Sequence, residues 1–174
     1  MNRSNKVFWA QVKLACIRRT DINAKNEYYP IKDHAIMAEQ FEQVTVNLTN
    51  DKVQFTGTSK SNPTRPIAFD FKPPMGDGEG YNGLELLLMS LAGCSGTTIL
   101  YLLRKMGKKI SGLKVNAKGI KRDQPPIKFE KIFLEFLLTS EDTQDAEMHK
   151  AIELAKASVC PVWQMVKNNE GGHN

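Results

Sequence analysis

The spacing of apolar and polar residues predicts five strands. Two short alternating stretches lie on either side of the turn signal Asn50-Asp51 and predict a hairpin, and a third short strand follows a polar loop at residues 61–65. Two longer stretches flank a second turn, at residues 123–126, and predict a second strand pair. The five predicted strands cover residues 43–48, 52–58, 66–71, 113–120 and 129–138.

Two stretches follow helical periodicity instead. Residues 84–105 are apolar on nearly every face, which is typical of a buried central helix, and Gly107 follows the cations Arg104 and Lys105 that suit a helix end. Residues 141–158 predict an amphipathic helix, which Cys160-Pro161 interrupts before a further helical turn. The turn-rich residues 73–83 predict no regular element.

This order of elements favours an α+β fold, with two groups of antiparallel strands around one apolar helix. The chain of 174 residues is long enough for one domain with a substantial core, which we place at residues 37–169. Residues 1–36 are interpreted either as a loosely attached, disordered extension or as sequence upstream of a true start at Met37. Two alternatives remain for that segment: a partner-binding helix around residues 7–17, or an arginine-rich targeting segment. Residues 170–174 are predicted to be a disordered tail.

Charge and composition exclude several classes of function. The net charge is +5, but residues 1–36 hold seven Lys and Arg against three Asp and Glu, so +4 of it lies there. A nearly neutral remainder argues against a nucleic-acid partner. Polar residues interrupt the most apolar stretch, and residues 7–17 lack the features of a secretory signal, so we expect no membrane span and a cytoplasmic location. The cysteines form no CxxC motif and the histidines (His34, His149 and His173) are scattered, so we expect no metal.

Three residues are candidates for chemistry. Cys94 follows Gly93 and precedes Gly96 within the apolar helix, so the small residues admit either a substrate or a closely packed neighbouring element beside the thiol. Cys160 stands before the helical turn that Pro161 opens, where unpaired backbone N–H groups favour a thiolate. Each cysteine can equally be an inert core residue, and spacing does not show that the two meet. Glu85, in the first helical turn, either stabilises that end or places a polar group to one side of Cys94.

Two of these segments together resemble the OsmC/Ohr family. ELLLMSLAGCSGTTILYLLRKMG, at residues 85–107, is similar to the family's central helix, and AIELAKASVCPVWQMV, at residues 151–166, is similar to its Cys-Pro-Val segment. The resemblance covers about residues 40–169 and implies an intertwined homodimer, with antiparallel strands wrapped around long central helices. It also implies that Cys94 attacks an organic hydroperoxide, that Cys160 then forms a disulfide with it, and that a dithiol such as dihydrolipoamide restores both thiols in oxidative-stress defence. No metal, flavin or haem is needed.

The sequence departs from the hydroperoxide-reducing branch near Cys94. Leu84 takes the position of that branch's glutamate, with Glu85 one residue later, and Gly83 replaces a proline. The branch also supplies an arginine, for which Lys52 and Arg65 are the nearest cations in this sequence. A thiol without a neighbouring cation is expected to have a raised pKa. The resemblance therefore leaves an alternative open, a non-catalytic redox sensor or apolar-ligand-binding protein, as well as cysteines that serve packing alone.

Overall fold

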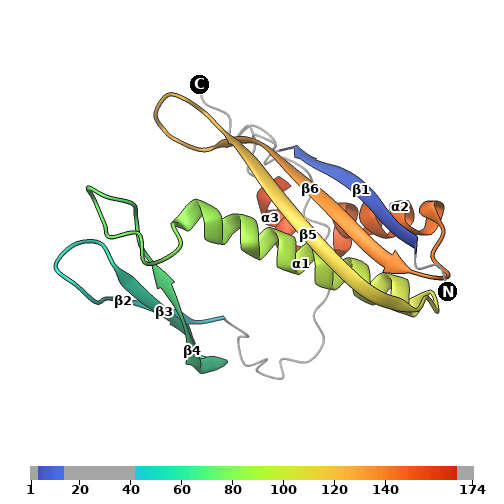
Figure 1. Ribbon diagram of the computed structural model, residues 1–174, viewed down its shortest axis with the longest axis horizontal. Helices are drawn as coiled ribbons and strands as arrows, with labels where there is room; N and C mark the ends of the chain where they lie inside the picture. The colour runs from blue at the N-terminus through green and yellow to red at the C-terminus, as the bar shows by residue number, and fades with distance from the viewer. Residues whose placement is uncertain (1–3, 14–41, 168–174) are drawn as a thin grey trace, which may run out of the picture. The chain divides into compact units, whose positions relative to one another are not determined.

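The computed structural model describes residues 4–13 and 42–167. These fall into two compact units, residues 42–86 in one and residues 4–13 with 87–167 in the other. Figure 1 shows the strands and helices of each unit.

The smaller unit is a three-stranded antiparallel sheet. Its strands, in the order β2-β3-β4, are β2 (Val44–Leu48), β3 (Phe55–Ser59) and β4 (Asn62–Phe69). The predicted hairpin is confirmed, but the loop expected at residues 61–65 is wrong from Asn62 onward. Pro63 is compatible with this strand because β4 lies at an edge of the sheet. N–H groups on the outer side of an edge strand have no partner strand, so a proline there removes no hydrogen bond of the sheet.

The larger unit also contains a three-stranded antiparallel sheet, in the order β1-β6-β5. The two longer predicted strands are confirmed as β5 (Ile110–Lys121) and β6 (Phe129–Ser140), each extended by a few residues. The third strand, β1 (Ser4–Lys13), pairs with β6 from Ser4 opposite Ser140 to Lys13 opposite Lys131. Side chains of β6 alternate between buried and less buried positions, which is the pattern of a sheet with one covered face.

Strand β1 lies in the segment that was expected to be a loose extension. A helix beginning at Val7 is wrong for the described part of that segment, because Ser4–Lys13 is a strand paired along its whole length. Its alternation is hidden in the sequence: Phe8 is buried, but its neighbours Val7 and Trp9 on the other face are apolar too, and Trp9 is 63% exposed. Residues 14–36 and 170–174 lie outside the described residues, so the limits of the domain at 37 and 169 stay predictions.

The central helix α1 (Gly83–Lys105) agrees closely with the predicted residues 84–105. Gly107 follows it with φ of +79°, a left-handed conformation that suits glycine after a helix. The helix was expected to be buried on nearly every face, but Leu87, Met89 and Tyr101 are exposed. Helix α1 is long and apolar enough to cross a membrane, with a mean hydropathy of 1.8, a test that the core helix of a soluble protein also passes. The buried stripe consists of Leu91, Ser95, Gly96, Thr98, Ile99 and Leu103.

The predicted second helix begins later than residue 141 and ends in a different form. Helix α2 (Asp145–Leu154) leads into a π-helical turn, η1 (Ala155–Val159), and helix α3 (Pro161–Lys167) follows. The late start has a local cause, since Gln144 and Glu147 form a capping box at the first turn of α2.

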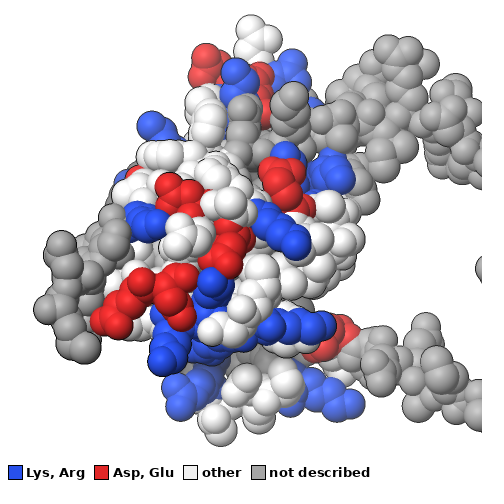
Figure 2. Space-filling model, turned by 90° about the vertical axis from the view of Figure 1, so that its right-hand side faces the viewer, with Lys and Arg blue, Asp and Glu red and all other residues white. Residues whose placement is uncertain are grey.

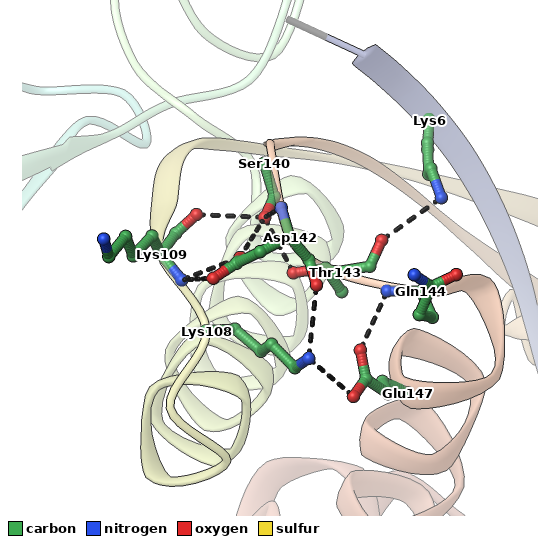
Figure 3. A network of polar contacts seen from close by, with 8 residues as sticks. All are labelled: Lys6, Lys108, Lys109, Ser140, Asp142, Thr143, Gln144 and Glu147. Atoms are coloured by element: carbon green, nitrogen blue, oxygen red, sulfur yellow. Dashed lines mark hydrogen bonds and ion pairs between the residues drawn. The ribbon is translucent and has the colours of Figure 1, made fainter.

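A polar corner before α2 replaces the first predicted helical turn (Figure 3). The Ser140 hydroxyl donates to the Lys109 carbonyl at 2.9 Å, and the Asp142 carboxylate accepts the Lys109 N–H at 3.0 Å. That N–H is the main cause that lowers the pKa of Asp142. Lys108 completes the corner with an ion pair to Glu147 at 2.7 Å. These contacts hold the start of β5 against the end of β6.

Charged side chains of both signs lie on the face of the molecule that Figure 2 shows. Lys and Arg gather in the lower part of that view, and Asp and Glu are more frequent above them.

Candidate active site around Cys94 and Cys160

The structure brings two of the three predicted site residues together. The Sγ atoms of Cys94 and Cys160 lie 3.1 Å apart, although 66 residues separate them in the sequence. Both are free thiols; Cys94 is half-buried and Cys160 is completely buried. A disulfide has an S–S length of about 2.05 Å, so a small movement of one side chain is sufficient to join them.

The π-helical turn η1 places Cys160. The N–H of Cys160 donates to the carbonyl of Ala155, five residues earlier, at 3.1 Å. Cys160 itself has extended φ and ψ of −84° and 111°, and Pro161 then opens α3. Such turns occur frequently at functional sites, because the extra residue changes the direction in which the following side chains point. The sequence showed an interruption at Cys160-Pro161 but gave no signal for a π turn.

Three influences act on the Cys94 thiol. Burial is the largest and raises its pKa, the backbone N–H of Val162 donates to the sulfur and lowers the pKa, and the Cys160 thiol raises it further. The result is a raised pKa, the direction that the sequence predicted. The N–H groups of α3 were expected to act on Cys160, whereas the one from Val162 acts on Cys94.

The raised pKa of Cys94 predicts a steep pH dependence of its reactivity. The thiolate is the nucleophile, and its fraction increases about tenfold per pH unit below the pKa. The rate of Cys94 alkylation by iodoacetamide, followed by peptide mass mapping, is therefore expected to go on rising above pH about 8.5, the usual cysteine pKa. A rate that levels off below that pH would contradict the prediction.

Ser95 is a neighbour of the thiol pair that the sequence reasoning missed. It follows Cys94 on α1, is fully buried, and its Oγ lies 3.8 Å from the Cys160 sulfur. The signal in the sequence was a polar residue within an apolar helical pattern, at a position where burial is expected.

Glu85 takes part in the cap of α1. The Asn82 side chain accepts the N–H groups of Leu84 and Glu85, both at 3.0 Å, and the Glu85 carboxylate accepts the Asn82 N–H at 2.9 Å. This is a capping box, the end-stabilising role that the sequence allowed. A part for Glu85 in chemistry stays a prediction.

Among the other residues that the sequence analysis named, Lys52 and Gly96 have structural contacts. Lys52 forms an ion pair with Asp77 at 2.5 Å, within the smaller unit. A Cβ added at Gly96 would lie 3.0 Å from Val115 Cγ2, so Gly96 permits close packing of α1 on β5, while a Cβ at Gly93 would meet nothing within 4 Å. Among residues 4–13 and 42–167, no three His, Cys, Asp or Glu side chains are grouped as metal ligands.

Together, the paired thiols and the antiparallel α+β fold define an OsmC-like fold that carries a dithiol site. Residues 76–170 match the family described as OsmC-like protein, and the chain belongs to that family. Among curated proteins, it is 29% identical over 84 residues to protein YhfA of Escherichia coli, a match that covers 48% of this chain and 63% of YhfA.

Solved structures show the same fold. A hypothetical protein from Aquifex aeolicus has a TM-score of 0.60 at 24% identity, over 74% of this chain and 88% of that one. An OsmC-like protein of unknown function from Vibrio cholerae has a TM-score of 0.62 at 14% identity, over 74% and 95%. A protein from Legionella pneumophila described as an organic hydroperoxide resistance protein OsmC has a TM-score of 0.51 at 14% identity, over 76% and 93%.

Proposed function

We propose that this protein is a thiol-dependent peroxidase that reduces organic hydroperoxides through Cys94 and Cys160. The observation that carries the proposal is the 3.1 Å separation of two free sulfur atoms, of which Cys94 is the more accessible. Family membership supports the assignment, because the similar Legionella pneumophila protein is described as an organic hydroperoxide resistance protein.

In the first half-reaction the Cys94 thiolate attacks the outer oxygen of the hydroperoxide. The O–O bond breaks, the alcohol leaves with a proton, and Cys94 becomes a sulfenic acid. The Cys160 thiolate then attacks the Cys94 sulfur, the S–O bond breaks, and the hydroxide leaves as water. Two thiols are oxidised for each hydroperoxide that is reduced.

In the second half-reaction a dithiol such as dihydrolipoamide reduces the disulfide. Cys160 is completely buried and Cys94 is half-buried, so the incoming thiolate attacks the Cys94 sulfur and Cys160 leaves. The second thiol of the reductant then releases Cys94 and closes its own disulfide. We place this chemistry in the cytoplasm, where dithiols are kept reduced. It requires no metal or organic cofactor.

The proposed working form is an intertwined homodimer. Helix α1 exposes Leu87, Met89 and Tyr101, which a single chain leaves in contact with water. The small sheet, taken separately, also exposes apolar side chains, namely Val44, Val46, Leu48 and Ile67. Exposed apolar surface of this kind marks a protein interface, and a second copy would supply the apolar cover.

A redox sensor with the same cysteine pair is the second candidate. In its favour, burial and the Cys160 thiol raise the pKa of Cys94 and no cation among the described residues lowers it, so repeated attack on a peroxide at neutral pH is slow. A sensor needs one oxidation for each signal, whereas a peroxidase must turn over many times.

Turnover distinguishes the two functions. The experiment measures consumption of cumene hydroperoxide by catalytic amounts of the full chain with dihydrolipoamide in excess. We expect many hydroperoxide molecules to be consumed per protein chain. Consumption that stops after one equivalent, with the disulfide formed, would favour the sensor, and no consumption with no disulfide would contradict both.

A further inference from the structure

We propose that Ser95 is a positioning residue whose hydroxyl holds the Cys160 sulfur and donates to it as Cys160 attacks Cys94. This inference deepens the proposed function and rests on it. It concerns only the step that converts the Cys94 sulfenic acid into the disulfide.

The geometry places Cys160 between two polar groups of α1. Its Sγ lies 3.1 Å from Cys94 Sγ and 3.8 Å from Ser95 Oγ. Ser95 and Cys160 are both 0% exposed, so water does not reach the contact in this chain. The Cys160 backbone N–H cannot serve as a donor to its own sulfur because it is bonded to the Ala155 carbonyl. Among the described residues, Ser95 is therefore the hydroxyl donor that faces this sulfur.

A structural role alone does not account for this serine. Buried hydroxyls on helices commonly donate to a carbonyl of the preceding turn, as Thr98 does to Cys94 at 2.9 Å. The Ser95 hydroxyl instead contacts the sulfur of Cys160, which lies 65 residues further along the sequence. Alanine would fill almost the same space, with a better helix propensity and no buried polar group.

The attack explains what the hydroxyl contributes. Cys160 must present negative charge on a sulfur that is out of contact with water, and an O–H donor offsets part of the lost hydration. As the S–S bond forms, the S–O bond of the sulfenic acid breaks, and the proton lost from Cys160 ends on the leaving hydroxide as water. A hydrogen bond to a charged group contributes enough to change this rate by about tenfold or more.

The test separates the two oxidation steps in the full chain carrying Cys16→Ser, so that Cys94 and Cys160 are the remaining thiols. Reduced protein is mixed with one equivalent of cumene hydroperoxide and quenched at set times with dimedone and N-ethylmaleimide. Peptide mass mapping then gives the amounts of Cys94 sulfenic acid and of the Cys94–Cys160 disulfide. Ser95→Ala is compared with Ser95→Thr, which keeps the hydroxyl, and with Thr98→Val, which removes a different buried hydroxyl from α1.

We expect Ser95→Ala to form sulfenic acid within about twofold of the normal rate but to form the disulfide about tenfold more slowly. Under excess hydroperoxide it is expected to accumulate sulfinic acid on Cys94, because the sulfenic acid persists. Ser95→Thr and Thr98→Val are expected to retain the normal disulfide rate within about threefold.

An unchanged disulfide rate in Ser95→Ala would overturn the inference, as would an equal loss in Ser95→Thr, since that would indicate packing and not the hydroxyl. If the protein with Ser95 intact forms neither sulfenic acid nor disulfide, the proposed function itself fails. The two failures are therefore distinguishable.

Discussion

Replacing Cys94 by serine is expected to abolish hydroperoxide reduction, with a loss of roughly a thousandfold or more in kcat/KM for cumene hydroperoxide. The reason is chemical: the serine hydroxyl keeps nearly the same shape but has neither the ionisation nor the polarisability that attack on an O–O bond requires. Steady-state consumption with dihydrolipoamide measures the effect.

Two further variants make the Cys94→Ser result specific. Cys160→Ser is expected to keep the first oxidation of Cys94 and to lose repeated turnover with the dithiol, because no disulfide closes within the chain. Cys16→Ser is the matched control and is expected to leave turnover within about twofold. Turnover that survives in Cys94→Ser would show that another group attacks the peroxide.

The largest expected loss of stability follows from truncating Phe136. Phe136 lies on the central strand β6, pairs with Phe8 on one side and Val115 on the other, and is fully buried. Phe136→Ala removes most of its buried surface and leaves a cavity, so the free energy of unfolding is expected to fall by about 3–5 kcal/mol. Urea unfolding followed by circular dichroism measures the change.

Lys131→Ala, on the same strand at an exposed position, is the control for Phe136→Ala. Its effect is expected to be within about 0.5 kcal/mol. A loss under about 1 kcal/mol in Phe136→Ala would contradict the packing described for β6, because it would require the core to close around the missing ring.

Strong periodicity explains which elements could be predicted from the sequence. Helix α1 and strands β5 and β6 have long stretches whose apolar spacing fits one period, and each was located within a few residues. The boundaries that differ have local causes. Helix α2 starts late because Ser140 and Asp142 satisfy backbone groups in a non-helical corner.

Other features depend on contacts that no local pattern contains. Strand β1 was missed because apolar residues lie on both of its faces, and because its partner strand is more than a hundred residues away in the sequence. The π-helical turn η1 (Ala155–Val159) likewise has no sequence pattern that distinguishes it from the α-helix before it.

The candidate site divides in the same way. Cys94 and Cys160 were identified from two sequence segments, but their meeting at 3.1 Å is a property of the fold. The contacts of Ser95 and of the Val162 N–H with the two sulfur atoms could be recognised only in the folded chain. Similarity to solved structures below 25% identity establishes the fold of this chain, and the chemistry has to be argued from the two thiols.

The central claim is that Cys94 and Cys160 form one redox pair that a hydroperoxide oxidises. It is tested most directly by adding one equivalent of cumene hydroperoxide to the reduced full chain and mapping the cysteine linkages by peptide mass spectrometry without reduction. The account predicts the loss of two thiols per hydroperoxide and a single intramolecular disulfide between Cys94 and Cys160. Two intact thiols at these positions after the hydroperoxide has been consumed, or a disulfide that involves Cys16 in place of either, would contradict it.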